Sequence, residues 1–307
     1  MPSHLDDAYW REYHVTPRYL AGSSFEGTLA LKPFRDLNWP QHHDDLGGLH
    51  VSSPDQRLRI GYFGDDYVLW KIAAYADPYS APQWAATFNH NTPTEIVAGL
   101  TATLADDYQA GTDRFLGPAP VYWAEGASPL TEAGWAHGAA ERGTVEIVAA
   151  DGQAGLFLDR RLQDPQDESW TLWAGPKGWG TRWEGTFTTR APTRLIAATA
   201  TAMADPAPVV RCEHMIAREC RDLVRLTPVQ PPPPPVPPRP TPLDARRTAV
   251  TQALRRAADT RHPDSRAVAA LARTTTSGLR GTTPSSAATP SPQGLSPAAP
   301  SRNGRRS

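Results

Sequence analysis

Apolar and polar residues alternate along several short runs of the chain, and each set of runs ends in a segment with helical spacing. The run Leu58-Arg59-Ile60-Gly61-Tyr62 has a period of two, which is typical of a strand with one buried face. The first set predicts an opening strand, a short helix, about four strands and a closing helix. The four strands are expected near residues 47–53, 57–63, 67–75 and 82–88.

The closing helix has a distinct start. Thr92-Pro93-Thr94-Glu95 has the pattern of a capping box, with a threonine cap, proline at the first helical position and a glutamate three residues after the cap. One apolar face follows at helical spacing, formed by Ile96, Val97, Leu100 and Leu104.

The same pattern then occurs a second time. Residues 16–20 recur as residues 112–116, an offset of 96. Towards the end of each copy the offset becomes 99, and it relates Trp84, Phe88, Pro93 and Asp106 to Trp183, Phe187, Pro192 and Asp205. So many agreements in the same order indicate a duplication.

We therefore predict an α+β fold of two tandem repeats, residues 12–108 and 111–206, related by a pseudo-twofold axis. Each repeat is an antiparallel sheet followed by a packing helix. Residues 207–228 are expected to form a C-terminal helix on the repeats, and residues 229–307 a disordered tail.

These residues also carry a resemblance to a known family. Val15-Thr16-Pro17-Arg18-Tyr19-Leu20-Ala21-Gly22, Ser53-Pro54-Asp55 and the Trp84/Phe88/Thr92-Pro93 helix start resemble the SPDY-motif family of actinobacteria, a domain of unknown function often found as two tandem copies. The second copy departs from the motif with Ala149-Ala150-Asp151, and Gln56 stands where the motif has tyrosine. The resemblance implies the tandem organisation and no particular activity.

Composition separates the tail from the rest. Residues 229–307 contain 15 of the 32 prolines and no tryptophan, tyrosine or phenylalanine, so they cannot bury enough apolar surface to fold alone. Twelve arginines against three aspartates give the tail a net charge of +9, which leaves −10 for the remainder. Pro231–Pro240 predicts a polyproline II spacer or docking segment. Beyond it, Leu243, Val250 and Leu254 fit one face of an arginine-rich helix.

No cofactor, catalytic constellation or complete metal site is indicated. His42-His43-Asp44-Asp45 is the densest group of potential ligands, but four consecutive residues seldom converge on one ion, so a solvated loop is favoured over a metal site at His42 and His43. Cys212 and Cys220 are expected on one helix, where their separation of about 12 Å would prevent a disulfide.

Four side chains are candidates for ligand contact. Arg18 and Arg114 recur at equivalent positions, which would suit phosphate binding. Trp173 and Trp179 have no aromatic counterpart in the first copy, so stacking on a ligand is as good an interpretation as packing. The tryptophans at matched positions of the two copies, Trp70/Trp170 and Trp84/Trp183, are by contrast interpreted as packing residues.

We expect a cytoplasmic protein, because the chain lacks a signal peptide and a long apolar segment. The leading hypothesis is a non-catalytic binding or scaffold protein that contacts an unknown protein or other ligand through the paired repeats. The second is nucleic-acid binding through the sheets and the basic tail. The third is a degenerate enzyme with its site in the first copy.

Overall fold

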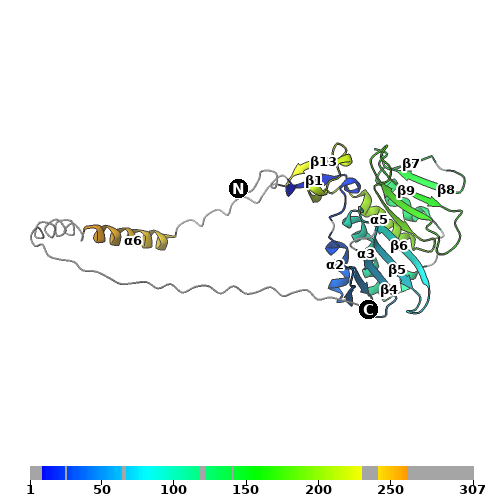
Figure 1. Cartoon of the computed structure of the whole chain (residues 1–307), viewed down its shortest axis with the longest axis horizontal. Coiled ribbons are helices and arrows are strands. Elements are labelled where there is room, and N and C mark those ends of the chain that lie inside the picture. Colours follow the sequence, from blue (N-terminus) through cyan, green and yellow to red (C-terminus); the bar gives the residue numbers. More distant parts are fainter. Residues whose placement is uncertain are drawn as a thin grey trace, which may run out of the picture. The chain divides into compact units, whose positions relative to one another are not determined.

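The structure is a computed structural model that describes residues 9–24, 26–63, 67–111, 113–117, 122–139, 141–229 and 241–260 (Figure 1). The chain divides into two compact units, Met1–Pro231 and Pro232–Ser307. Both predicted repeats lie in the first unit.

Within the described residues of the first unit, ten strands form one antiparallel sheet that runs through both copies, in the order β2-β3-β4-β5-β6-β11-β10-β9-β8-β7 (Figure 1). The first copy contributes β2 (Gln41–His43), β3 (Leu49–Ser52), β4 (Leu58–Tyr62), β5 (Val68–Tyr75) and β6 (Pro82–Asn89). The second contributes β7 (Ala136–His137), β8 (Thr144–Val148), β9 (Ala154–Asp159), β10 (Trp170–Ala174) and β11 (Trp183–Phe187). The predicted α+β class and antiparallel pairing are confirmed. Each copy has an edge strand, β2 or β7, in addition to the four expected, and the described residues of the second copy include no counterpart of the predicted opening strand.

Helices pack on one face of this sheet (Figure 1). They are α2 (Thr28–Asp36), α3 (Thr94–Gln109), α4 (Ala124–Glu132) and α5 (Thr193–Ala204). Between the helices and the sheet lies a core that includes all four paired tryptophans, Trp70, Trp84, Trp170 and Trp183, each at most 1% exposed. The interpretation of these four as packing residues is confirmed.

The two copies meet at a pseudo-twofold axis between β6 and β11. Thr87 lies opposite Thr186, its own counterpart at an offset of 99, and their hydroxyl oxygens are 2.8 Å apart. Behind this seam α3 crosses α5 so closely that a Cβ on Gly99 would lie 2.6 Å from the Cβ of Ala202. Only glycine permits this approach of the two helices.

The opening turn of each copy is hydrogen-bonded to a tryptophan of the other copy. The indole nitrogen of Trp84, in the first copy, donates a hydrogen bond of 2.7 Å to the carbonyl of Phe115, in the opening 3-10 turn η2 (Asp113–Leu116) of the second. Trp183 makes the equivalent bond of 2.8 Å to Tyr19, in the opening turn η1 (Arg18–Leu20) of the first. Each copy therefore completes the other.

The predicted helix over residues 207–228 is wrong. This segment contains two strands, β12 (Val209–Cys212) and β13 (Arg225–Pro228), which pair with the two edges of β1 (Glu12–Thr16) in a separate three-stranded sheet. Residues 210–226 are rich in helix formers, but β1 has two open edges, and pairing with them overrides local propensity. Cys212 and Cys220 are free, and Cys220 is buried, as expected for a small core residue.

The predicted capping box does not form either. The hydroxyl of Thr92 donates to the side chain of Asn89, and the carboxylate of Glu95 accepts two hydrogen bonds from Arg211 on β12. Arg211 is 2% exposed and also donates to the carbonyl of Gly22. Glu95 therefore forms an ion pair with Arg211 of the three-stranded sheet and does not cap α3.

The second unit contains helix α6 (Pro242–Thr260), which agrees with the helical spacing of Leu243, Val250 and Leu254. These three side chains are exposed. The proline segment and the rest of the predicted disordered tail, residues 230–240 and 261–307, lie outside the described residues. No helix in the described part of the chain has the length and apolar character needed to cross a bilayer.

Candidate ligand pocket

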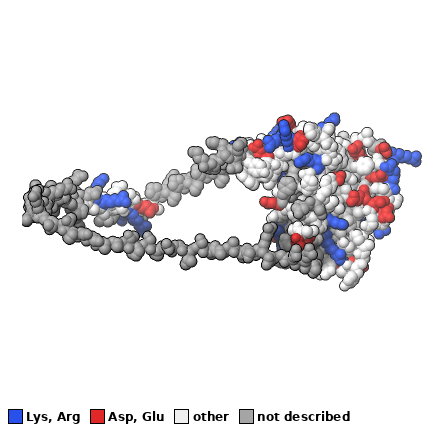
Figure 2. Space-filling view, in the orientation of Figure 1, with Lys and Arg blue, Asp and Glu red and all other residues white. Residues whose placement is uncertain are grey.

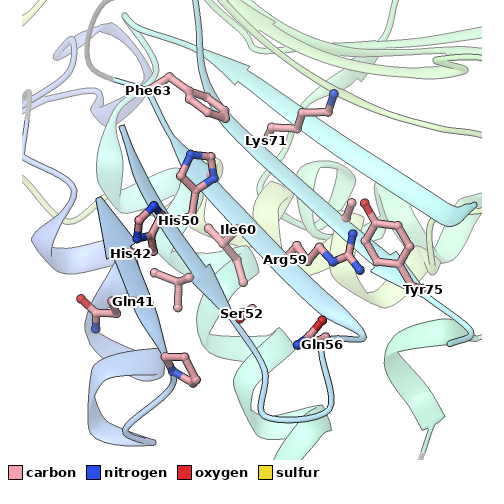
Figure 3. A pocket seen from close by; sticks show the side chains of 14 residues that line it. Gln41, His42, His50, Ser52, Gln56, Arg59, Ile60, Phe63, Lys71 and Tyr75 are labelled. Carbon is pink, nitrogen blue, oxygen red and sulfur yellow. The ribbon is translucent and has the colours of Figure 1, made fainter. Parts of the chain in front are cut away.

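A pocket of about 420 Å³ opens on the outer face of the sheet, opposite the helices and within the first copy (Figure 3). This size is sufficient for a small organic ligand. Strands β2 to β5 supply most of its lining. The described lining residues are Pro40, Gln41, His42, His50, Val51, Ser52, Gln56, Arg59, Ile60, Gly61, Phe63, Lys71, Ala73 and Tyr75.

The floor of the pocket is made by two small residues on neighbouring strands. Gly61 on β4 and Ala73 on β5 both face outward, because residues on either side of them, such as Ile60 and Ile72, point into the core. The ring of Phe63 folds over Gly61, where an added Cβ would lie 2.5 Å from the ring. Glycine at this position therefore allows the aromatic wall at that end of the pocket.

Two cationic side chains line the pocket. Arg59 donates a hydrogen bond of 2.6 Å to the carbonyl of Pro78, and its guanidinium carbon lies 4.3 Å from the centre of the Tyr75 ring. These contacts hold the guanidinium at the rim of the pocket. Lys71, on the adjacent strand β5, is exposed and extends over the same face (Figure 3).

Histidines form the opposite side of the pocket. His42 pairs with His50 across β2 and β3, so both stand on the outer face. His50 Nε2 lies 3.0 Å from Asp44 Oδ2, and this hydrogen bond, with backbone N–H bonds, lowers the pKa of Asp44. In the described part of the chain His50 is bonded to Asp44 and to no serine or cysteine, so no nucleophile is paired with it.

The predicted loop at His42 and His43 is wrong, because both residues lie in strand β2. The turn begins only at Asp44, whose carboxylate accepts hydrogen bonds from the amides of Leu46 and Gly48. Among the described residues no three histidine, cysteine or acidic side chains converge as metal ligands.

The second copy lacks this pocket lining. At the corresponding positions Gly155 replaces Arg59, Thr171 replaces Lys71 and Trp173 replaces Ala73. A Cβ on Gly155 would lie 2.8 Å from the Trp173 indole, so the tryptophan covers the position that corresponds to Arg59. The strands can therefore form without the pocket-lining side chains Arg59, Lys71 and Ala73 of the first copy.

The four predicted ligand contacts lie apart from the pocket. The guanidinium of Arg18 is engaged inside the protein, 2.7 Å from Asp205 Oδ2 and 2.9 Å from the carbonyl of Ala202. Arg114 is exposed on η2, Trp173 lies half-buried against Gly155, and Trp179 is 75% exposed in the loop between β10 and β11. The structure does not bring these four together.

The aspartates of the family motif, Asp55 and Asp151, lie in turns, and each turn contacts the opening segment of the other copy. Asp55 accepts hydrogen bonds from the hydroxyl of Ser53 and the amide of Arg57, and Arg57 forms an ion pair of 2.8 Å with Asp113 of the second copy. Asp151 accepts a hydrogen bond of 2.7 Å from the hydroxyl of Tyr19. Burial and this bond to Asp151 raise the pKa of Tyr19. The motif thus serves the contact between the copies.

Comparison with known families agrees with this organisation. The family model described as SPDY, a domain of unknown function (DUF317), matches residues 52–110 and 151–209. The first match extends from the last residue of β3 to the end of α3, and the second from the turn before β9 to the first residue of β12. No curated protein and no solved structure matches the chain. The chain therefore contains two tandem copies of the SPDY domain, as the motif residues indicated.

Proposed function

We propose that this chain is a non-catalytic, cytoplasmic binding protein whose ligand occupies the outer-face pocket of the first SPDY copy. The leading hypothesis from the sequence expects ligand contact through the paired repeats, without a particular site. The pocket is a better candidate, because it is concave and combines aromatic walls with several polar groups, as ligand sites do.

The observation that carries this proposal is the difference between the copies. Both copies build the same five strands, but only the first places small residues, Gly61 and Ala73, beneath polar and aromatic walls. In the second, Trp173 lies across Gly155. A scaffold that folds with either set of residues has no structural need for the first set, which supports a role in binding.

The test gives the outer face of the first copy the residues that the second copy has at the same positions. The double variant Arg59→Gly, Ala73→Trp is expected to stay folded, because these residues stand at the equivalent positions of the second copy. It is expected to lose binding of small aromatic probes, because the new indole would fill the pocket. Phenyl phosphate, benzoate, benzyl alcohol and benzylammonium can be titrated while the amide resonances of β4 and β5 are followed by NMR.

Trp173→Ala is the matched control, since it alters the same face of the sheet in the second copy. Probe binding at β4 and β5 is expected to persist in this variant. Binding that survives the double variant but disappears in the control would overturn the proposal and place the site at Trp173.

Nucleic-acid binding is the second candidate, and the observation that favours it is helix α6. Its arginines Arg246, Arg247, Arg255 and Arg256 are all exposed, and basic side chains stand out along the helix in Figure 2. Changing all four to glutamine in the full chain should weaken binding of a labelled single-stranded oligonucleotide. The plot of log affinity against log salt is expected to flatten by up to about 3 if each arginine meets one phosphate. An unchanged slope would exclude α6 as the binding element.

A further inference from the structure

The charges of the pocket identify a class of ligand. Building on the proposed function, we infer that the pocket binds a small molecule with a phosphate or carboxylate group attached to an aromatic or other apolar body. The oxyanion would lie at Arg59, with Lys71 on the adjacent strand adding positive charge to the same face, and the body would lie over Ala73 and against the Phe63 ring.

The first argument is the charge of the described lining, which contains two permanent cations, two histidines and no aspartate or glutamate. The nearby acid Asp44 is hydrogen-bonded to His50 and to two backbone amides, so its charge is already engaged. This cationic site belongs to a folded part of the chain that is acidic overall. In Figure 2 acidic side chains gather over the strands of the second copy.

The second argument is the preorganisation of Arg59. Its bond to the Pro78 carbonyl uses one of five guanidinium N–H donors, and the Tyr75 ring supports the guanidinium. Within the described residues Arg59 has no carboxylate partner. A fixed guanidinium with donors to spare suits two-point recognition of a carboxylate or phosphate.

The third argument comes from the second copy, where every cationic position has changed. Gly155 and Thr171 replace the arginine and the lysine, Glu146 replaces His50, and Gly138 replaces His42. The same strands thus fold with an acidic group in place of a basic one. Packing therefore does not explain the positive charge of the first face, whereas an anionic ligand does.

The apolar part of the ligand follows from the walls. Phe63 closes one end of the pocket and Tyr75 stands at the other (Figure 3). Between them β4 and β5 place the small residues Gly61 and Ala73 next to Lys71 and Arg59. An aromatic or aliphatic body can pack between these rings while its oxyanion reaches the cations. A bare inorganic anion would leave most of the 420 Å³ unfilled.

The experiment uses the full chain and compares the four probes by NMR titration. Phenyl phosphate is expected to bind at least about tenfold more tightly than benzyl alcohol, because charge-assisted hydrogen bonds are the stronger ones. Benzylammonium is expected to bind worst. Benzoate separates the two anion sources: equal affinity for benzoate and phenyl phosphate indicates a carboxylate site, and a preference for phenyl phosphate indicates a phosphate site.

Lys71→Thr, which introduces the second-copy residue, should reduce phenyl phosphate affinity about tenfold and leave benzyl alcohol affinity unchanged. Lys32→Thr is the matched control, since Lys32 is an exposed lysine on α2 paired with Asp36. It removes the same charge away from the pocket and should leave both affinities unchanged.

The outcomes separate this inference from the proposed function. Equal binding of charged and neutral probes, or tightest binding of benzylammonium, would overturn the anionic class and leave the pocket as a binding site. Perturbation of β4 and β5 by none of the four probes at millimolar concentration would overturn both.

Discussion

Replacing Arg211 by alanine is expected to lower the free energy of unfolding by about 3–5 kcal/mol. Arg211 is 2% exposed and donates two hydrogen bonds to Glu95, at 2.8 and 2.5 Å. Its loss would leave the carboxylate of Glu95, itself only 19% exposed, without its cation. The Arg211–Glu95 pair also joins β12 of the three-stranded sheet to helix α3, which packs on the ten-stranded sheet. Urea denaturation followed by tryptophan fluorescence measures the change.

Arg221→Ala is the control, because it removes an arginine from the same C-terminal segment. Arg221 is 43% exposed and lies 3.4 Å from Glu213, so its removal should cost less than about 1 kcal/mol. Similar losses in the two variants would contradict the structural importance assigned to the buried pair.

The effect of Arg211→Ala should also depend on pH. Burial raises the pKa of Glu95, but the hydrogen bonds and charge of Arg211 outweigh burial and bring it below the ordinary value of 4.5. In the wild type this pair stabilises the fold above that value and loses its effect as the pH falls through the lowered pKa. Without Arg211 the largest influence left on the pKa of Glu95 is burial, which favours the protonated carboxyl, while its backbone hydrogen bond and the charge of Arg18 act in the opposite direction. The difference between wild type and variant should therefore be smaller near pH 4 than at pH 7.

The duplication is the part of the fold that was predictable from the sequence. Matched residues at constant offsets, such as Trp84 and Trp183, predicted two equivalent α+β units and their packing helices, because similar sequences bury similar faces. The joining of the two sheets was not predictable in this way. It depends on the register of β6 against β11, and local patterns contain no information on which strand edges will meet.

The errors in the fold prediction have the same origin. Residues 209–212 form a strand because they pair with β1, and Glu95 forms an ion pair because Arg211 lies beside it. In both places a contact with a distant part of the chain replaces the local structure that the sequence pattern predicts. The polar strand β2 was missed because it has no buried apolar face; its three residues are all exposed. Periodicity detects only strands that contribute to a core.

The candidate pocket was missed because it is formed by small residues. Arg59 and Lys71 have the pattern of ordinary solvent-facing positions in two strands, and Gly61 and Ala73 carry no chemical signal of their own. One signal was present in the sequence: Trp173 has no aromatic counterpart, and its aligned residue is Ala73. The sequence makes Trp173 itself a candidate contact. In the structure the pocket lies in the first copy, where Ala73 stands in place of this tryptophan.

Replacing Trp84 by alanine is expected to cost about 3–5 kcal/mol, as is usual for a fully buried aromatic side chain. The more specific expectation concerns where the damage appears. Trp84 belongs to the first copy, but its indole holds the carbonyl of Phe115 in the second, and Trp183 holds Tyr19 in return. Hydrogen exchange should therefore speed up in η2 of the second copy as well as in β6. The chain should still unfold in one transition, because neither copy is complete alone.

Trp84→Phe separates the hydrogen bond from the bulk of the side chain. It keeps a ring but removes the N–H group, so it should cost about 1–3 kcal/mol and loosen η2 more than β6. Trp183→Phe should produce the mirror effect at η1, and Trp179→Ala, at an exposed indole, should change stability by no more than about 0.5 kcal/mol. Two separate unfolding transitions, or faster exchange confined to the mutated copy, would show that the copies are independent domains joined only by their sheet. A single transition with exchange effects that cross between the copies instead means that a ligand bound to the first copy stabilises both.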